Sequence, residues 1–117
     1  MTNSKRNEIE TKAIQESIEH WTRMIDWVKK QSKQYRSFHK RMEIEINESW
    51  FARDCALCKI YRDRYGDNCD KCPLYESYYI CQDPKSIWRK IYYSHNWKEW
   101  LYWAYRMRAT LQRLIND

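Results

Sequence analysis

The spacing of apolar side chains predicts two long helices, one near each end of the chain. In residues 8–31 and again in residues 96–115, apolar side chains recur every three or four positions, which places them on one face of a helix. The first stripe consists of Ile14, Ile18, Trp21, Ile25 and Val28, widened by Met24 and Trp27. The second consists of Trp97, Leu101, Ala104, Met107, Leu111 and Leu114. We expect each helix to bury its stripe against the other helix or against a partner.

Shorter elements are predicted between these helices. Residues 42–47 alternate apolar and polar side chains, which is the periodicity of a strand. Such a strand would pair with residues 34–38 as a hairpin or pack beside the loops that follow. Further along, Asp83-Pro84 is typical of a helix start and predicts a short helix to about Tyr93, with Ser94 as the N-cap of the final helix. The predicted fold is mostly α, with a short β-hairpin as an open alternative.

The cysteines change this picture most. Cys55 and Cys58 form one pair, Cys69 and Cys72 form a second, and ten residues separate the pairs. Two residues between paired thiols let both sulfurs face one ion, so this spacing is typical of a closed tetrathiolate site, and we predict structural zinc. An iron–sulfur cluster or disulfides are the alternatives, but the paired spacing and the odd count of five cysteines favour metal. Residues 50–81 form the predicted metal region.

The fifth cysteine, Cys81, leaves the ligand set open. It is a buried, inert thiol beside the site, a ligand that replaces Cys55, or a reactive nucleophile, which would need a low pKa and a neighbouring base. Four thiolates would fill the zinc shell and leave no open position for a substrate. The sequence also lacks the H-E-x-x-H and His-x-Glu patterns of catalytic zinc sites, and its single Gly excludes a glycine-rich phosphate loop. We therefore expect no enzymatic activity.

Composition and charge limit the classes of protein to which the chain can belong. We expect a chain of 117 residues to form one domain, residues 1–117. Because a domain of this size has a modest core, a bound metal would add to its stability. The formal net charge is +6, and zinc bound by four thiolates would lower it to about +4. This charge permits nucleic acid binding without demanding it. No apolar run could span a bilayer and no leader is visible, so we expect a cytoplasmic protein.

A basic stretch at residues 29–41 is the first candidate binding surface. It contains six cations and no acid, interleaved with Tyr35, Phe38 and His39. The cations are Lys29, Lys30, Lys33, Arg36, Lys40 and Arg41. Phosphate contacts combined with aromatic stacking would suit single-stranded nucleic acid or a nucleotide. The alternative is a solvated helix end, where cations complement the helix dipole.

The second candidate surface lies on the C-terminal helix. Its aromatic residues Trp100, Tyr102, Trp103 and Tyr105 wrap around most of the helix, so they cannot all face the N-terminal helix. Trp, Tyr and Arg are the residue types of interface hot spots, which predicts a partner surface around Trp103 and Arg106, with a homodimer as the simplest version. The alternative is that a small domain fills a thin core with large aromatic side chains.

A set of residues distributed over positions 20–115 resembles a known group of proteins. The set is His20, Trp21, Met24, Ile25, Trp27, Trp50, Cys55-Ala56-Leu57-Cys58-Lys59-Ile60-Tyr61, Cys69-Asp70-Lys71-Cys72-Pro73-Leu74, Cys81, Trp88, Trp97, Trp100, Ala104 and Met107. In these positions the chain resembles a family of short, Cys-rich proteins commonly encoded by tailed phages and prophages. The resemblance implies a phage origin and a role inside the infected cell, but it supplies no activity for individual residues.

These observations lead to one functional prediction and one alternative. We expect a non-enzymatic, zinc-stabilised protein that engages a host macromolecule such as a protein of a defence system, with inhibition of that target as one outcome. The alternative is a nucleic-acid or nucleotide-binding protein that uses residues 29–41.

Overall fold

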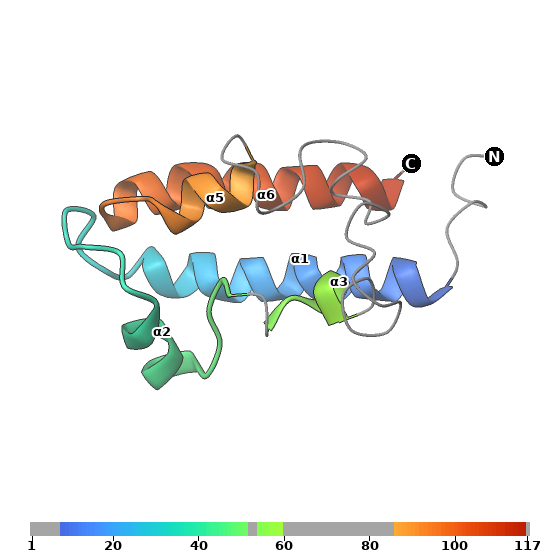
Figure 1. Cartoon of the computed structure of the whole chain (residues 1–117), viewed down its shortest axis with the longest axis horizontal. Coiled ribbons are helices and arrows are strands. Elements are labelled where there is room, and N and C mark those ends of the chain that lie inside the picture. Colours follow the sequence, from blue (N-terminus) through green and yellow to red (C-terminus); the bar gives the residue numbers. More distant parts are fainter. Residues whose placement is uncertain (1–7, 52–53, 60–85, 117) are drawn as a thin grey trace.

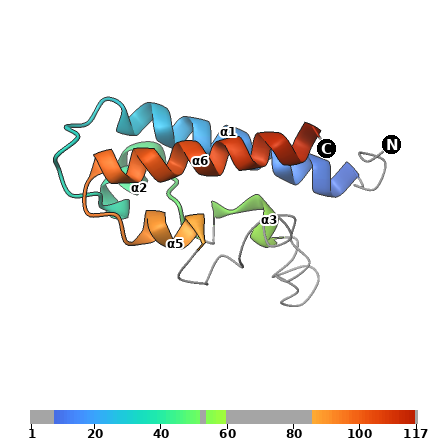
Figure 2. The ribbon, with the colours of Figure 1, turned by 90° about the horizontal axis from the view of Figure 1, so that it is seen from above.

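The structure is a computed structural model and describes residues 8–51, 54–59 and 86–116. The described residues are mostly helical and contain no strand. The helices are α1 (Glu8–Val28), α2 (His39–Ile46), α3 (Ala56–Cys58), α5 (Ile87–Tyr92) and α6 (Trp97–Asn116). The two long helices, α1 and α6, lie side by side and antiparallel along the molecule (Figure 1). Seen from above, α5 and α3 lie on the same side of this helical pair (Figure 2).

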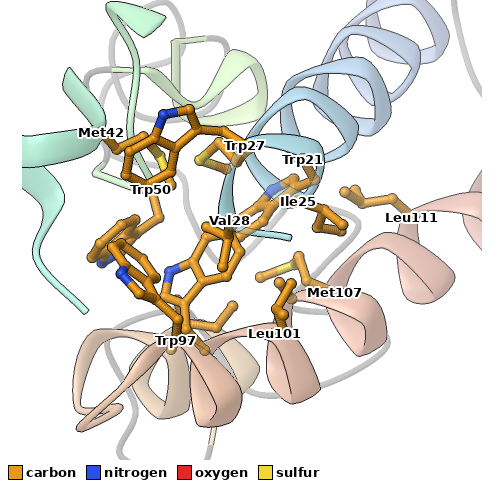
Figure 3. Close-up of a cluster of buried hydrophobic side chains, with 14 of the residues drawn as sticks. Trp21, Ile25, Trp27, Val28, Met42, Trp50, Trp97, Leu101, Met107 and Leu111 are labelled. Atoms are coloured by element: carbon orange, nitrogen blue, oxygen red, sulfur yellow. The ribbon is translucent and has the colours of Figure 1, made fainter. Parts of the chain in front are cut away.

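The two apolar stripes form the core, as predicted. All six stripe positions of α6 are buried, and so are those of α1 apart from Ile18, which is half-buried at the edge of the core. Figure 3 shows Trp21 and Ile25 of α1 gathered with Leu101 and Met107 of α6. The paired long helices of the prediction are therefore confirmed, and each buries its apolar face mainly against the other.

Tryptophan rings fill the centre of the core. Trp50, from the segment after α2, meets Trp97 and Trp100 of α6 with ring centroids 6.0 and 5.5 Å apart. Trp27 of α1 packs edge-on against Trp97 at 5.4 Å and donates its Nε1–H to Glu45 at 2.9 Å. The indole nitrogens of Trp50, Trp97 and Trp100 have no hydrogen-bond partner within the described part of the chain. The three rings pack edge-to-face with one another, an arrangement that the aromatic quadrupole favours.

The strand predicted for residues 42–47 is wrong, because helix α2 (His39–Ile46) covers this segment. Met42 is fully buried and Ile46, four residues later, is half-buried, so both lie on the same helical face. Ile44 is 84% exposed. The alternating pattern thus contained one i, i+4 helical pair and one solvent-exposed isoleucine. Residues 34–38, the proposed second strand, lie in the connection between α1 and α2.

The predicted helix ends also need correction. Helix α1 ends at Val28 rather than at residue 31. Helix α5 begins at Ile87, after Ser86, whose hydroxyl accepts the Arg89 N–H at 3.1 Å; the proposed start at 83–84 lies outside the described residues. Helix α6 is capped by Asn96, whose Oδ1 accepts the Glu99 N–H at 2.9 Å. Ser94, the predicted cap, instead donates its hydroxyl to the Ile91 carbonyl of α5.

Candidate functional site

The first cysteine pair forms a tight turn on the surface of α1. Cys55 is the N-cap of α3, and its sulfur accepts the Cys58 N–H at 3.2 Å. The Lys59 N–H then bonds to the Cys55 carbonyl at 3.1 Å and closes the turn. Between the two cysteines, Leu57 is 1% exposed and belongs to the core. The buried leucine therefore anchors α3 while both thiols stay half-buried at the surface.

The surroundings of Cys55 favour its thiolate form. The hydrogen bond with the Cys58 side chain lowers the pKa of Cys55, and this outweighs burial, which would raise it. The backbone N–H groups of Leu57 and Cys58 and the nearby charge of Lys59 act in the same direction. The thiolate is the form that binds metal, so a lowered pKa at Cys55 is a property expected of a zinc ligand, while zinc itself stays a prediction.

The remaining ligands lie outside the described residues. These are Cys69 and Cys72, together with the alternative ligand Cys81. Within residues 8–51, 54–59 and 86–116, no three or more His, Cys, Asp and Glu side chains are grouped so that they could hold a metal ion. The turn at Cys55 and Cys58 fits half of a tetrathiolate site, and the full ligand set stays a prediction.

A charged cluster that sequence reasoning missed lies across an open pocket from this turn. Glu48 accepts hydrogen bonds from Arg23 at 2.6 and 3.0 Å and also contacts the ring of His20. Burial is the largest single effect and would raise the pKa of Glu48, but the hydrogen bonds and the charges of Arg23 and His20 together leave that pKa below its ordinary value. The pocket holds about 420 Å³ and is also lined by Lys59. The partners of Glu48 are 25 and 28 positions away in sequence, so no local pattern pointed to them.

The cations of the basic stretch have different surroundings. Lys33 donates its ammonium group to the carbonyls of Lys29 and Gln31, at 3.0 and 3.4 Å, and so covers the C-terminal end of α1. Lys40 points to solvent. Arg36 and Arg41 instead line an open pocket of about 520 Å³. The other lining residues are Tyr35 and Phe38. The structure therefore brings together two of the predicted cations and separates them from Lys33.

The predicted partner residues on α6 do come together. Arg106 donates to the Tyr102 hydroxyl at 2.7 Å, and its guanidinium lies 4.7 Å from the Tyr102 ring and 5.8 Å from the Trp103 ring. Tyr102 is 53% exposed, whereas Trp103 is half-buried and packs against the edge of the core. Trp100, which the sequence placed with them, is fully buried. We refer to Tyr102, Trp103 and Arg106 as the α6 cluster.

Comparison with known proteins gives no match. No family model matches the chain, and neither the curated proteins nor the solved structures contain a significant relative. The resemblance to phage-encoded Cys-rich proteins therefore depends on the motifs alone. None of the described helices is long and apolar enough to cross a membrane.

Proposed function

We propose that this chain is a non-catalytic, zinc-stabilised protein that binds a host protein through the α6 cluster. The observation that carries the proposal is the arrangement of Arg106 over Tyr102 and Trp103 on the solvent side of α6. Trp, Tyr and Arg carry most of the binding energy in protein interfaces.

The α6 cluster is also held in place before any partner arrives. The hydrogen bond from Arg106 to Tyr102 and the packing of Trp103 against the core restrict three large side chains. Ordering such side chains costs roughly 0.5–1.5 kcal/mol each on association, so a prearranged cluster avoids part of that cost. On α5, Lys90 lies 6.0 Å from the Trp103 ring and adds a second cation to the same surface.

Zinc has a structural role in this proposal. Cys55, Cys58, Cys69 and Cys72 would hold one Zn²⁺, which supplies folding free energy rather than Lewis acidity because four thiolates close its coordination shell. The turn at Cys55 supports the assignment, since it places Cys55 and Cys58 three positions apart in one turn, with the Cys58 N–H donated to the Cys55 sulfur. The metal would fix the chain that connects α3 to α5.

The resemblance to phage-encoded proteins gives the proposal its biological setting. A small non-catalytic protein made during infection acts by occupying a surface of a host macromolecule, and proteins of defence systems are targets of this kind. In this setting the protein works in the cytoplasm of the infected cell. A second copy of this chain is the simplest partner that the α6 cluster could bind.

Truncation of the α6 cluster tests the proposal. Wild-type protein and the Trp103→Ala variant are compared for thermal unfolding, for sedimentation as monomer or dimer, and for binding to each protein captured from host lysate. A hot-spot residue should lose about 2 kcal/mol or more of binding, in excess of any loss of stability from removing the contacts of Trp103 with the edge of the core. The Ile44→Ala variant is the matched control, since Ile44 is an exposed apolar side chain on α2. Unchanged binding by the Trp103→Ala variant would contradict the proposed surface.

A further inference from the structure

The pocket beside the α1–α2 connection has a size and lining that suit one small ligand. It is open to solvent and holds about 520 Å³, within the range of small-molecule sites. Its lining residues are two aromatic residues, Tyr35 and Phe38, and two arginines, Arg36 and Arg41.

The aromatic walls leave their rings accessible. Tyr35 is 58% exposed and Phe38 is 50% exposed. Phe38 is oriented by an edge-to-face contact with His39, at 5.5 Å between ring centroids, and His39 in turn stacks on Phe51 at 4.1 Å. This chain of contacts fixes one edge of Phe38 and leaves the ring available for stacking against a planar group.

The cations in the pocket differ from Arg23 in their surroundings. Arg23 is paired with Glu48, and the ion pairs found among the described residues do not include Arg36 or Arg41. Residues 29–41 contain no acid at all. The pocket thus offers two guanidinium groups, the side chains best suited to bidentate recognition of phosphate.

The backbone around the pocket is fixed by contacts with the start of α6 and with the segment that precedes it. The Tyr35 carbonyl accepts the Trp97 N–H at 3.0 Å, and the Ser37 hydroxyl donates to the Ser94 carbonyl at 2.9 Å. Helix α2 begins directly after Phe38, which is its N-cap and has no side-chain oxygen to satisfy the first N–H groups. The first turn of α2 contains no acid, so its positive end adds to the attraction for an anion.

We propose that this pocket binds a nucleoside phosphate, either a free nucleotide or one unit of a single strand. The base stacks on Tyr35 or Phe38, and the phosphate binds the guanidinium groups of Arg36 and Arg41. The site is distinct from the α6 cluster and shares no residue with it. The chemistry is recognition by stacking and charge, with no bond made or broken.

Fluorescence anisotropy with labelled twelve-nucleotide oligo-dT and oligo-U tests the site. In 50 mM NaCl the Arg36→Ala/Arg41→Ala variant should bind at least about tenfold more weakly than wild type. Its slope of log affinity against log salt should be shallower by about 0.7, the value for the one phosphate group that the variant no longer binds. The Tyr35→Leu/Phe38→Leu variant should lose at least about fivefold, the lower end of the contribution of one stacked base.

A charge-matched variant separates a built site from general attraction. Lys12→Ala/Arg113→Ala removes two exposed cations outside the pocket, so it should bind within about twofold of wild type. Circular dichroism checks the fold, and Arg36→Gln/Arg41→Gln replaces the alanine pair if that variant unfolds. If millimolar UMP or AMP displaces the labelled strand, a free nucleotide is sufficient to occupy the pocket. If the strand binds and neither nucleotide displaces it, the ligand is the strand. The proposal would be overturned if wild type bound neither oligo-dT nor oligo-U. It would also be overturned if the pocket variants and the control variant lost affinity equally.

Discussion

Trp21 of α1 and Trp100 of α6 lie with their ring centroids 6.0 Å apart, and both side chains are almost fully buried. The contact joins the two long helices at positions 79 residues apart in the sequence. Replacing Trp21 by Ala should lower the free energy of unfolding by about 3–5 kcal/mol, because it empties a large volume at the centre of the helical pair.

Chemical denaturation monitored by circular dichroism measures this loss. The Ile44→Ala variant is the control, since an 84% exposed side chain should change stability by no more than about 0.5 kcal/mol. Similar stability of Trp21→Ala and wild type would show that α1 and α6 do not depend on this contact.

Metal content is the second prediction. Purified protein should contain close to one equivalent of zinc, and chelation or the Cys69→Ser change should remove most of the helical signal, because binding free energy at such sites is of order 10 kcal/mol and is largely folding free energy. Elemental analysis and circular dichroism provide the measurements.

The cysteine variants also distinguish the two ligand sets. If the Cys55→Ser variant loses zinc and the Cys81→Ser variant keeps it, the ligands are the two cysteine pairs. If Cys81→Ser loses zinc and Cys55→Ser keeps it, Cys81 replaces Cys55 as a ligand. Full helicity after complete removal of metal would refute the structural role of zinc.

Glu48 should contribute to the pH dependence of stability. Burial would raise its pKa, but the hydrogen bonds and charges of Arg23 and His20 together lower that pKa in the folded protein from the ordinary value of 4.5. A lowered folded pKa means that the contribution is complete above pH 4.5 and is lost as the pH falls through the folded pKa. Glu48→Gln should therefore be less stable than wild type at pH 7, and the difference should shrink below pH 4.5.

Thermal unfolding between pH 3 and pH 7 measures this trend. Asp26→Asn is a useful comparison, since Asp26 is an exposed carboxylate on α1. A stability difference for Glu48→Gln that is constant across this range would contradict the assigned role of the ionised carboxylate.

Asn47 should control the end of α2. It adopts a left-handed conformation with φ of 61°, and its N–H bonds to the Glu43 carbonyl at 2.9 Å. Asn47→Ala should cost about 1 kcal/mol because alanine tolerates this conformation poorly, whereas Asn47→Gly should be neutral or stabilising. Equal stabilities of the alanine and glycine variants would be evidence against the helical end at this position.

The parts of the fold that follow from local periodicity were predictable. Long stripes such as those containing Trp21 and Leu101 repeat over several turns, so the helical period is unambiguous. Six residues at 42–47 are too few to separate a strand from a helix with one exposed isoleucine, and tertiary burial of Met42 decided the outcome.

The candidate sites also divide into features that the local sequence predicts and features that depend on tertiary packing. The Cys55–Cys58 spacing specified a tight turn because the two residues are close in sequence. The pairing of Arg23 with Glu48 depends on the packing of two separate segments, and the local sequence of neither segment indicates it. Likewise, the basic stretch was visible in the sequence, but only the folded backbone separates Lys33 at the helix end from Arg36 and Arg41 in the pocket.

The tryptophan-filled core has a spectroscopic consequence. Five of the seven Trp residues are buried, and Trp50, Trp97 and Trp100 have ring centroids within 6.0 Å of one another. Rings at these separations couple their electronic transitions, so near-ultraviolet circular dichroism reports the packing of the core directly. Emission from the half-buried Trp103 responds instead to events at the surface of α6. The protein thus carries separate intrinsic reporters of its folding and of its encounters with other molecules.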